Sequence, residues 1–251
     1  MNKTKIDWCD STWNPVTGCL HGCEYCYARR IAHRFSGGGE NWEDEETIVL
    51  FEKLHGLDGK VLAYPYGFKP TFHRYRLNDY IGKKGRNIFV CSMADLFGEW
   101  VPDSWIEEVF KVCEKDPQHN YLFLTKNPQR YVELAEKGIL RRLDNMWYGS
   151  TVTAMEEYFS SEKTYNTFLS IEPMLSSVSP STIEGVKWII MGAETGRRKD
   201  KVIPEKWWIE RIVEDCKRRN IPVFMKSSLA DIWGEPLIQE FPDELKRGGA
   251  E

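Results

Sequence analysis

Three cysteines lie within eight residues near the amino end of this 251-residue chain, in the stretch CLHGCEYCY. Cys19, Cys23 and Cys26 have the spacing Cys-x3-Cys-x2-Cys. Thiolates bind soft metal ions and iron–sulfur clusters. The chain has seven cysteines and no apolar signal segment at its amino end, which favours a reducing, cytoplasmic compartment. In that compartment we expect clustered thiols to be metal ligands rather than disulfide partners.

Two kinds of metal site are compatible with this loop. A structural zinc site needs four Cys or His ligands, and His21, Cys9 or His33 would have to supply the fourth. A zinc-stapled α/β barrel of this kind would be a binding protein without redox chemistry. A [4Fe–4S] cluster held by three cysteines instead leaves one iron open to a small molecule. Gly18 and Gly22 would let the loop curl around such a cluster.

Charge and hydropathy limit the classes of function. The formal net charge is −4 at pH 7, so the chain as a whole lacks the positive field of a nucleic-acid-binding protein, although local basic patches stay compatible. No apolar run of about 18 residues occurs, so we expect no membrane contact. Aromatic residues make up 13% of the chain. They can fill a core or line a pocket for a flat substrate.

After residue 86 the chain alternates short apolar runs with amphipathic stretches. Most of the runs are continuously apolar, which is typical of strands buried on both faces of a parallel sheet. Repeated units of this kind build a barrel or an open doubly wound sheet. With one more strand before Cys19, they predict a single α/β domain with a partial parallel barrel. The runs are 87–93, 120–126, 146–152, 166–173, 186–192 and 221–227.

Helical patterns fill most of the connections. We expect helices over 27–35, 102–115, 127–138, about 154–160 and 204–220. Residues 36–86 break the pattern. They form an irregular insertion, which is either a lid or binding loop over the site or a solvated surface segment. Within it, residues 73–86 mix aromatic and basic side chains, a composition that fits either a nucleic-acid contact or a solvated face. The tail 242–251 is expected to be frayed.

Polar residues follow the apolar runs where each run stops. In parallel barrels the chemistry lies at the C-terminal ends of the strands, so these side chains should meet around one site. A single residue of this kind is as readily explained as a cap or turn residue, but a polar end on every strand favours a site. The residues are Ser92, Asp95, Thr125, Lys126, Ser150, Thr151, Glu172, Glu194 and Lys226.

The cysteine loop resembles the cluster loop of radical S-adenosylmethionine (radical SAM) enzymes, in which an aromatic residue, here Tyr25, precedes the third cysteine. The order of first strand, loop, helix and serial strand–helix units is also similar to that superfamily, and implies its partial (β/α)6-type barrel. A narrower resemblance, to the phage-associated three-cysteine-motif family of radical SAM proteins, covers nearly the whole chain. It rests on the segments DWCDSTWNPVTGC, FVCSMADLFGEWVP, SIEPML and IIMGAETGRR.

The resemblance implies that Cys19, Cys23 and Cys26 hold a [4Fe–4S] cluster whose fourth iron binds S-adenosylmethionine. These enzymes commonly hold the methionine amino group with a Gly-Gly-Glu motif. Here that place reads SMADLFGE, so Asp95 or Glu99 would have to supply the carboxylate. The full set of cofactor-binding residues expected on this basis is Tyr25, Ser92, Asp95, Ser150, Thr151, Gly192 and Glu194.

The implied reaction needs an external one-electron donor of the flavodoxin or ferredoxin type. Reduction would cleave the sulfonium C–S bond, and the 5′-deoxyadenosyl radical would take a hydrogen atom from an organic substrate. Radical SAM enzymes of phages include some that modify bases in DNA, which is a lead to a nucleobase or nucleotide as the substrate. Isomerase, lyase and transferase reactions all stay open. The residues expected to orient the substrate are Lys126, Glu172, Glu194 and Lys226.

Overall fold

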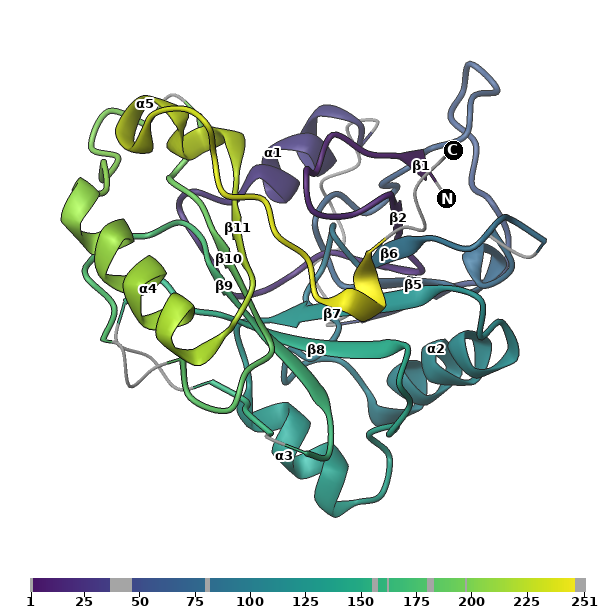
Figure 1. Ribbon diagram of the computed structural model, residues 1–251. Coiled ribbons are helices and arrows are strands. Elements are labelled where there is room, and N and C mark those ends of the chain that lie inside the picture. The colour runs from purple at the N-terminus through teal and green to yellow at the C-terminus, as the bar shows by residue number, and fades with distance from the viewer. Residues whose placement is uncertain are drawn as a thin grey trace.

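The chain folds into a parallel sheet that curls into a half-barrel (Figure 1). The computed structural model describes residues 2–36, 47–79, 82–154, 158–161, 163–179, 183–196 and 198–246. The sheet order is β1-β2-β6-β7-β8-β9-β10-β11, and every neighbouring pair is parallel except β1 with β2. The strands are β1 (Asn2–Lys3), β2 (Ser11–Trp13), β6 (Asn87–Val90), β7 (Asn120–Thr125), β8 (Met146–Thr151), β9 (Asn166–Ile171), β10 (Trp188–Met191) and β11 (Val223–Met225).

The predicted fold class is therefore confirmed, with a strand for each of the six apolar runs and β2 before the cysteine loop. Helices α2, α3 and α4 follow one another around the outer face of the half-barrel (Figure 1). The helices are α1 (Tyr27–Arg34), α2 (Asp103–Lys115), α3 (Gln129–Glu136), α4 (Lys206–Arg219) and the short α5 (Ala230–Trp233). Of the helix predicted at 154–160, residues 155–157 lie outside the described residues and 158–160 are not helical.

Side chains of each strand alternate between two apolar layers, because successive residues of a strand point to opposite faces. On the outer side, Ile88, Tyr121 and Tyr148 belong to the core under α2 and α3. Core residues such as Leu169 and Ile189 lie under α4 and α5. The inner side carries large aromatic residues that fill the base of the half-barrel. They are Trp8, Phe89, Trp147, Phe168, Trp188 and Phe224, all buried.

Gly149 makes room for one of these rings. A Cβ atom at Gly149 would lie 2.3 Å from Cζ of Phe168, on the neighbouring strand β9. Such a distance is far below van der Waals contact, so the ring of Phe168 occupies the space that a side chain at 149 would need. The absence of a side chain at Gly149 therefore permits the tight inner packing of the half-barrel.

The C-terminal segment closes the base of the half-barrel. Residues 237–240 run beside β11, where the backbone N–H of Met225 donates to Ile238 O at 2.7 Å. Farther along, Nδ2 of Asn87 donates to Leu245 O at 2.9 Å, and Leu245 is buried. The frayed tail predicted at 242–251 is thus wrong for residues 242–246, because these contacts hold them. Residues 247–251 lie outside the described residues.

Two strands of the insertion at 36–86, β4 (Ile48–Leu50) and β5 (Thr71–His73), join β3 (Val16–Thr17) in a small second sheet of order β3-β5-β4. The basic stretch that begins at residue 73 anchors this sheet. The buried His73 contacts Thr17 Oγ1 at 2.8 Å, Arg74 pairs with Glu108 of α2, and Arg76 donates to Asn14 O. These three side chains make structural contacts, whereas the nucleic-acid contact considered for 73–86 stays a prediction. Residues 80 and 81 lie outside the described residues.

None of the helices in the described ranges has the length and apolar character needed to cross a membrane.

We expect Gly149→Ala to lower the free energy of unfolding by about 1–3 kcal/mol, because its methyl group overlaps the ring of Phe168. Urea denaturation of a double-mutant cycle with Phe168→Leu would measure this. In the Phe168→Leu background the cost of the alanine should be clearly smaller, because the shorter side chain leaves space. An equal cost in both backgrounds would contradict the steric explanation.

Candidate functional site

A cavity of about 650 Å³ opens at the C-terminal ends of the parallel strands. This is the end of the half-barrel at which chemistry is expected. The cysteine loop forms one wall, and the ends of β7 to β11 form the other. Among the residues predicted from the sequence, those that line the cavity are Cys19, Cys23, Tyr25, Cys26, Ser92, Asp95, Thr125, Lys126, Thr151, Glu172, Glu194 and Lys226.

Two of the expected cofactor-binding residues, Ser150 and Gly192, lie outside this lining. Ser150 is buried, and its Oγ accepts a hydrogen bond from the backbone N–H of Phe159 at 3.0 Å. It precedes the lining residue Thr151 by one position, so the two side chains point to opposite faces of β8. Gly192 leaves space for two lining residues. A Cβ atom there would lie 3.2 Å from Cδ of Lys226 and 3.3 Å from Cδ of Glu172.

The cysteine loop curls tightly because two glycines adopt left-handed backbone angles. Gly18 has φ +89°, and a Cβ atom there would lie 2.1 Å from the carbonyl oxygen of Lys69. Gly22 has φ +73°. Both conformations are strained for residues with a side chain. After the loop, Sγ of Cys26 accepts a hydrogen bond from the backbone N–H of Arg29 at 3.3 Å, so this cysteine also caps α1.

The loop gathers the three thiols in one region. Cys19 and Cys26 contact the same apolar cluster, which includes Phe68 and Met93. Burial raises the pKa of the Cys19 thiol to about 12, and the nearby Cys23 and Cys26 contribute to the rise. The thiol is therefore protonated at neutral pH, and a metal would have to displace that proton. Within the described ranges, no three His, Cys, Asp or Glu side chains form a group that could hold a single metal ion.

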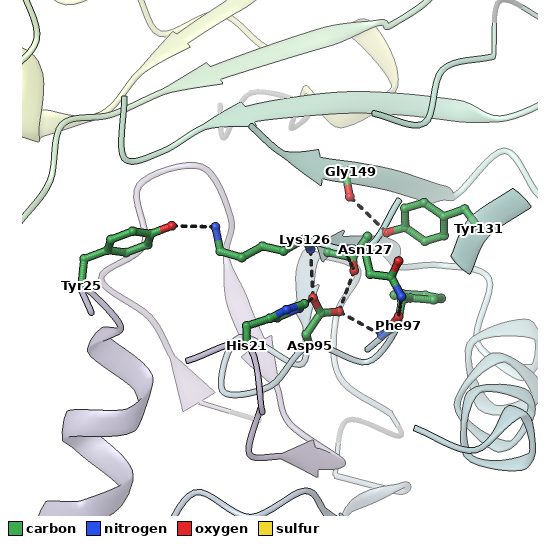
Figure 2. A network of polar contacts seen from close by, with 9 residues as sticks. His21, Tyr25, Asp95, Phe97, Lys126, Asn127, Tyr131 and Gly149 are labelled. Carbon is green, nitrogen blue, oxygen red and sulfur yellow. Dashed lines mark hydrogen bonds and ion pairs between the residues drawn. The ribbon is translucent and has the colours of Figure 1, made fainter. Parts of the chain in front are cut away.

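The carboxylate of Asp95 holds this loop against the strand ends (Figure 2). Its Oδ2 lies 2.7 Å from Nε2 of His21, one of the three residues between the first two cysteines, and accepts from the backbone N–H of Lys126 at 2.9 Å. Its Oδ1 accepts from Thr125 Oγ1 at 2.7 Å and from the backbone N–H of Phe97 at 3.0 Å. Both oxygens are thus occupied, so a cofactor amino group would compete with existing contacts.

A second contact joins the loop to the end of β7. Nζ of Lys126 donates to the hydroxyl of Tyr25 at 3.1 Å and lies 5.3 Å from the centre of its ring (Figure 2). Burial raises the pKa of Tyr25, and the ammonium group of Lys126 opposes that shift. The side chain of Lys126 therefore reaches across the cavity to the residue before the third cysteine.

The opposite wall carries two more ion pairs. Lys226 at the end of β11 pairs with Glu172 at the end of β9. Glu194, after β10, accepts from Nε and Nη2 of Arg198, both at 2.8 Å, and these hydrogen bonds lower the pKa of the Glu194 carboxyl. The four residues expected to orient a substrate thus all line the cavity, but each already has a partner.

Some residues of the site were not singled out from the sequence. Oδ1 of Asn14 accepts from Ser92 Oγ at 3.1 Å and from the backbone N–H of Met93 at 3.0 Å, and so shapes the wall beside the cysteines. Trp8 lies on the floor of the cavity. Both residues stand in the segment DWCDSTWNPVTGC, but no local pattern reveals their part in the site, because long-range packing of the amino-terminal segment brings them there.

A family model described as a protein of unknown function, DUF5131, matches residues 3–241. The chain belongs to the DUF5131 family. The match to the DUF5131 model takes in the cysteine loop, all strands from β2 to β11 and every residue that lines the cavity. Comparison with curated proteins and with solved structures found no match.

We expect Asp95→Asn to lower the free energy of unfolding by about 2–4 kcal/mol. The amide has one acceptor oxygen and an NH₂ group, so some of the four donors around Asp95 would face another donor. Chemical denaturation would measure the loss. The matched control is Asp58→Asn, an exposed carboxylate for which we expect no measurable change. Equal stabilities of the two variants would show that the carboxylate does not hold the loop.

Proposed function

We propose that the protein is a radical SAM enzyme that holds a [4Fe–4S] cluster through Cys19, Cys23 and Cys26. One observation carries the proposal: three thiols from one tightly curled loop form a wall of a large cavity at the C-terminal end of a parallel half-barrel. Thiolate is the ligand that such clusters require. The donor set therefore fits the group, and three thiolates would leave one iron of a bound cluster without a protein ligand.

The residues around the thiols would keep the loop in place. The contact between His21 and Asp95 fixes the segment between the first two cysteines, and the one between Tyr25 and Lys126 fixes the segment before the third. Backbone N–H groups of a curled, glycine-containing loop can also donate to cluster sulfur, which tunes its potential. When bound and reduced by one electron from an external donor, the cluster would supply the chemistry that splits S-adenosylmethionine into methionine and a 5′-deoxyadenosyl radical, which would take a hydrogen atom from the substrate.

The strand ends would bind and orient the organic ligands. Thr151 offers a hydroxyl, and Gly192 leaves room for the side chains of Glu172 and Lys226. We propose that Lys126, Glu172, Glu194 and Lys226 position the substrate, and that a flavodoxin- or ferredoxin-type protein is the electron donor. These donors, like the reducing compartment favoured by the free thiols, suit a cytoplasmic enzyme. A nucleobase or nucleotide, such as one in phage DNA, is the proposed substrate.

Anaerobic reconstitution with iron and sulfide would test the proposal. We expect a brown protein with about four iron atoms per chain, which releases 5′-deoxyadenosine from S-adenosylmethionine after reduction. Cys19→Ser, Cys23→Ser or Cys26→Ser should each abolish both the bound iron and the release of 5′-deoxyadenosine. The control is Cys216→Ala, which removes a buried thiol of the core under α4; it should keep the iron and the activity.

Two results would contradict the proposal. One is a colourless protein that contains one zinc ion per chain, which would support the zinc-stapled binding protein instead. The other is a fully loaded cluster that never cleaves S-adenosylmethionine under reducing conditions.

A further inference from the structure

The ion pair of Glu172 and Lys226 has unused hydrogen-bonding capacity that faces the cavity. A carboxylate can accept about four hydrogen bonds and an ammonium group can donate three. Within the described ranges, each of these side chains has the other as its one hydrogen-bond partner. Their side chains are 25% and 19% exposed, respectively, so both remain accessible. The pair thus presents an acceptor directly beside a donor.

Two hydroxyl groups lie next to this pair on the same inner face. Thr151 and Ser170 are register partners on β8 and β9, and both line the cavity. Ser170 is 1% exposed, and its Oγ has no hydrogen-bond partner among the described residues. Every second side chain of a strand points to the same face, so Ser170 shares the inner face with Phe168 and Glu172. A buried hydroxyl without a partner costs free energy, so its presence at the cavity indicates a ligand.

The floor beside these polar groups is apolar and partly aromatic. Trp8, Phe89 and Leu124 line the cavity there, and the rings of Trp8 and Phe89 lie 4.7 Å apart. Such a floor suits a flat ring. An amino-acid zwitterion could satisfy the charges of Glu172 and Lys226, but it would leave the hydroxyl of Ser170 and the aromatic floor without a matching group.

We infer that this inner face binds the amide edge of a nucleobase, an N–H group beside a C=O group as in thymine, uracil or guanine. Glu172 accepts from the ring N–H, Lys226 donates to the adjacent carbonyl, and Ser170 contacts a further polar atom of the ring. The inference rests on the proposed function only in assigning this ligand as the substrate. The binding itself requires neither the cluster nor a reductant.

Ligand-observed NMR and calorimetry on the full chain, without reductant, would test the inference with thymidine and 3-methylthymidine. Methylation removes the N–H that Glu172 accepts, so we expect it to weaken binding about tenfold or more. Equal affinities for the two nucleosides, or no binding of thymidine, would overturn the inference. Neither result would bear on the cluster assignment. Conversely, thymidine binding can be measured even if the protein fails to cleave S-adenosylmethionine.

A matched pair of variants on β9 separates binding from folding. Ser170→Ala removes a hydroxyl without a described partner, so we expect thymidine affinity to fall about fivefold while the thermal midpoint is unchanged or raised. Thr167→Val removes a hydroxyl that donates to Gly185 O at 3.0 Å outside the cavity, so it should lower the thermal midpoint and keep the affinity. An unchanged affinity in Ser170→Ala would overturn the assignment of this face.

Discussion

The carboxylate of Asp95 is the contact on which the site depends. It accepts hydrogen bonds from the end of β7, from the turn after β6 and from the loop that carries the cysteines. A buried carboxylate is stable only when its oxygens are satisfied, so these elements must all be in place together. The position of the three thiols relative to the strand ends is therefore a property of the folded half-barrel, and not of the loop alone. A single side chain thereby couples the architecture of the sheet to the geometry of the candidate cluster site.

The alternation of side chains across the sheet explains why one face lines a cavity while the other is a core. The outer residues of β8 and β9, such as Tyr148 and Leu169, are buried under helices, whereas the inner residues at the strand ends are polar. Closer to the base, the inner positions are large aromatic residues. The half-barrel is thus filled at one end and hollow at the other, and the depth of the cavity is set by where aromatic residues give way to Thr151 and Ser170.

Much of this arrangement was predictable from the sequence, because it depends on local patterns. Continuous apolar runs predicted the six later strands, and of the nine polar residues singled out at their ends all but Ser150 line the cavity. The error at Ser150 arose because periodicity alone does not tell which of two adjacent hydroxyls faces inward. The use of Asp95 as an anchor was not predictable either, since its four donors are separated from it by up to 74 residues. The ordered conformation of residues 242–246 was unpredictable for the same reason. It depends on a hydrogen bond from Asn87 to Leu245 O, and these two residues are 158 positions apart in the sequence.

The C-terminal segment that closes the base has a consequence for how the molecule is made. The segment that covers Trp188 and Phe224 follows every strand in the chain, so a polypeptide that ends before residue 238 leaves both rings without this cover. Transiently exposed aromatic surface of this kind favours association with other chains. Premature termination near the end of translation would therefore release a nearly complete half-barrel with an exposed aromatic base, which is prone to aggregate.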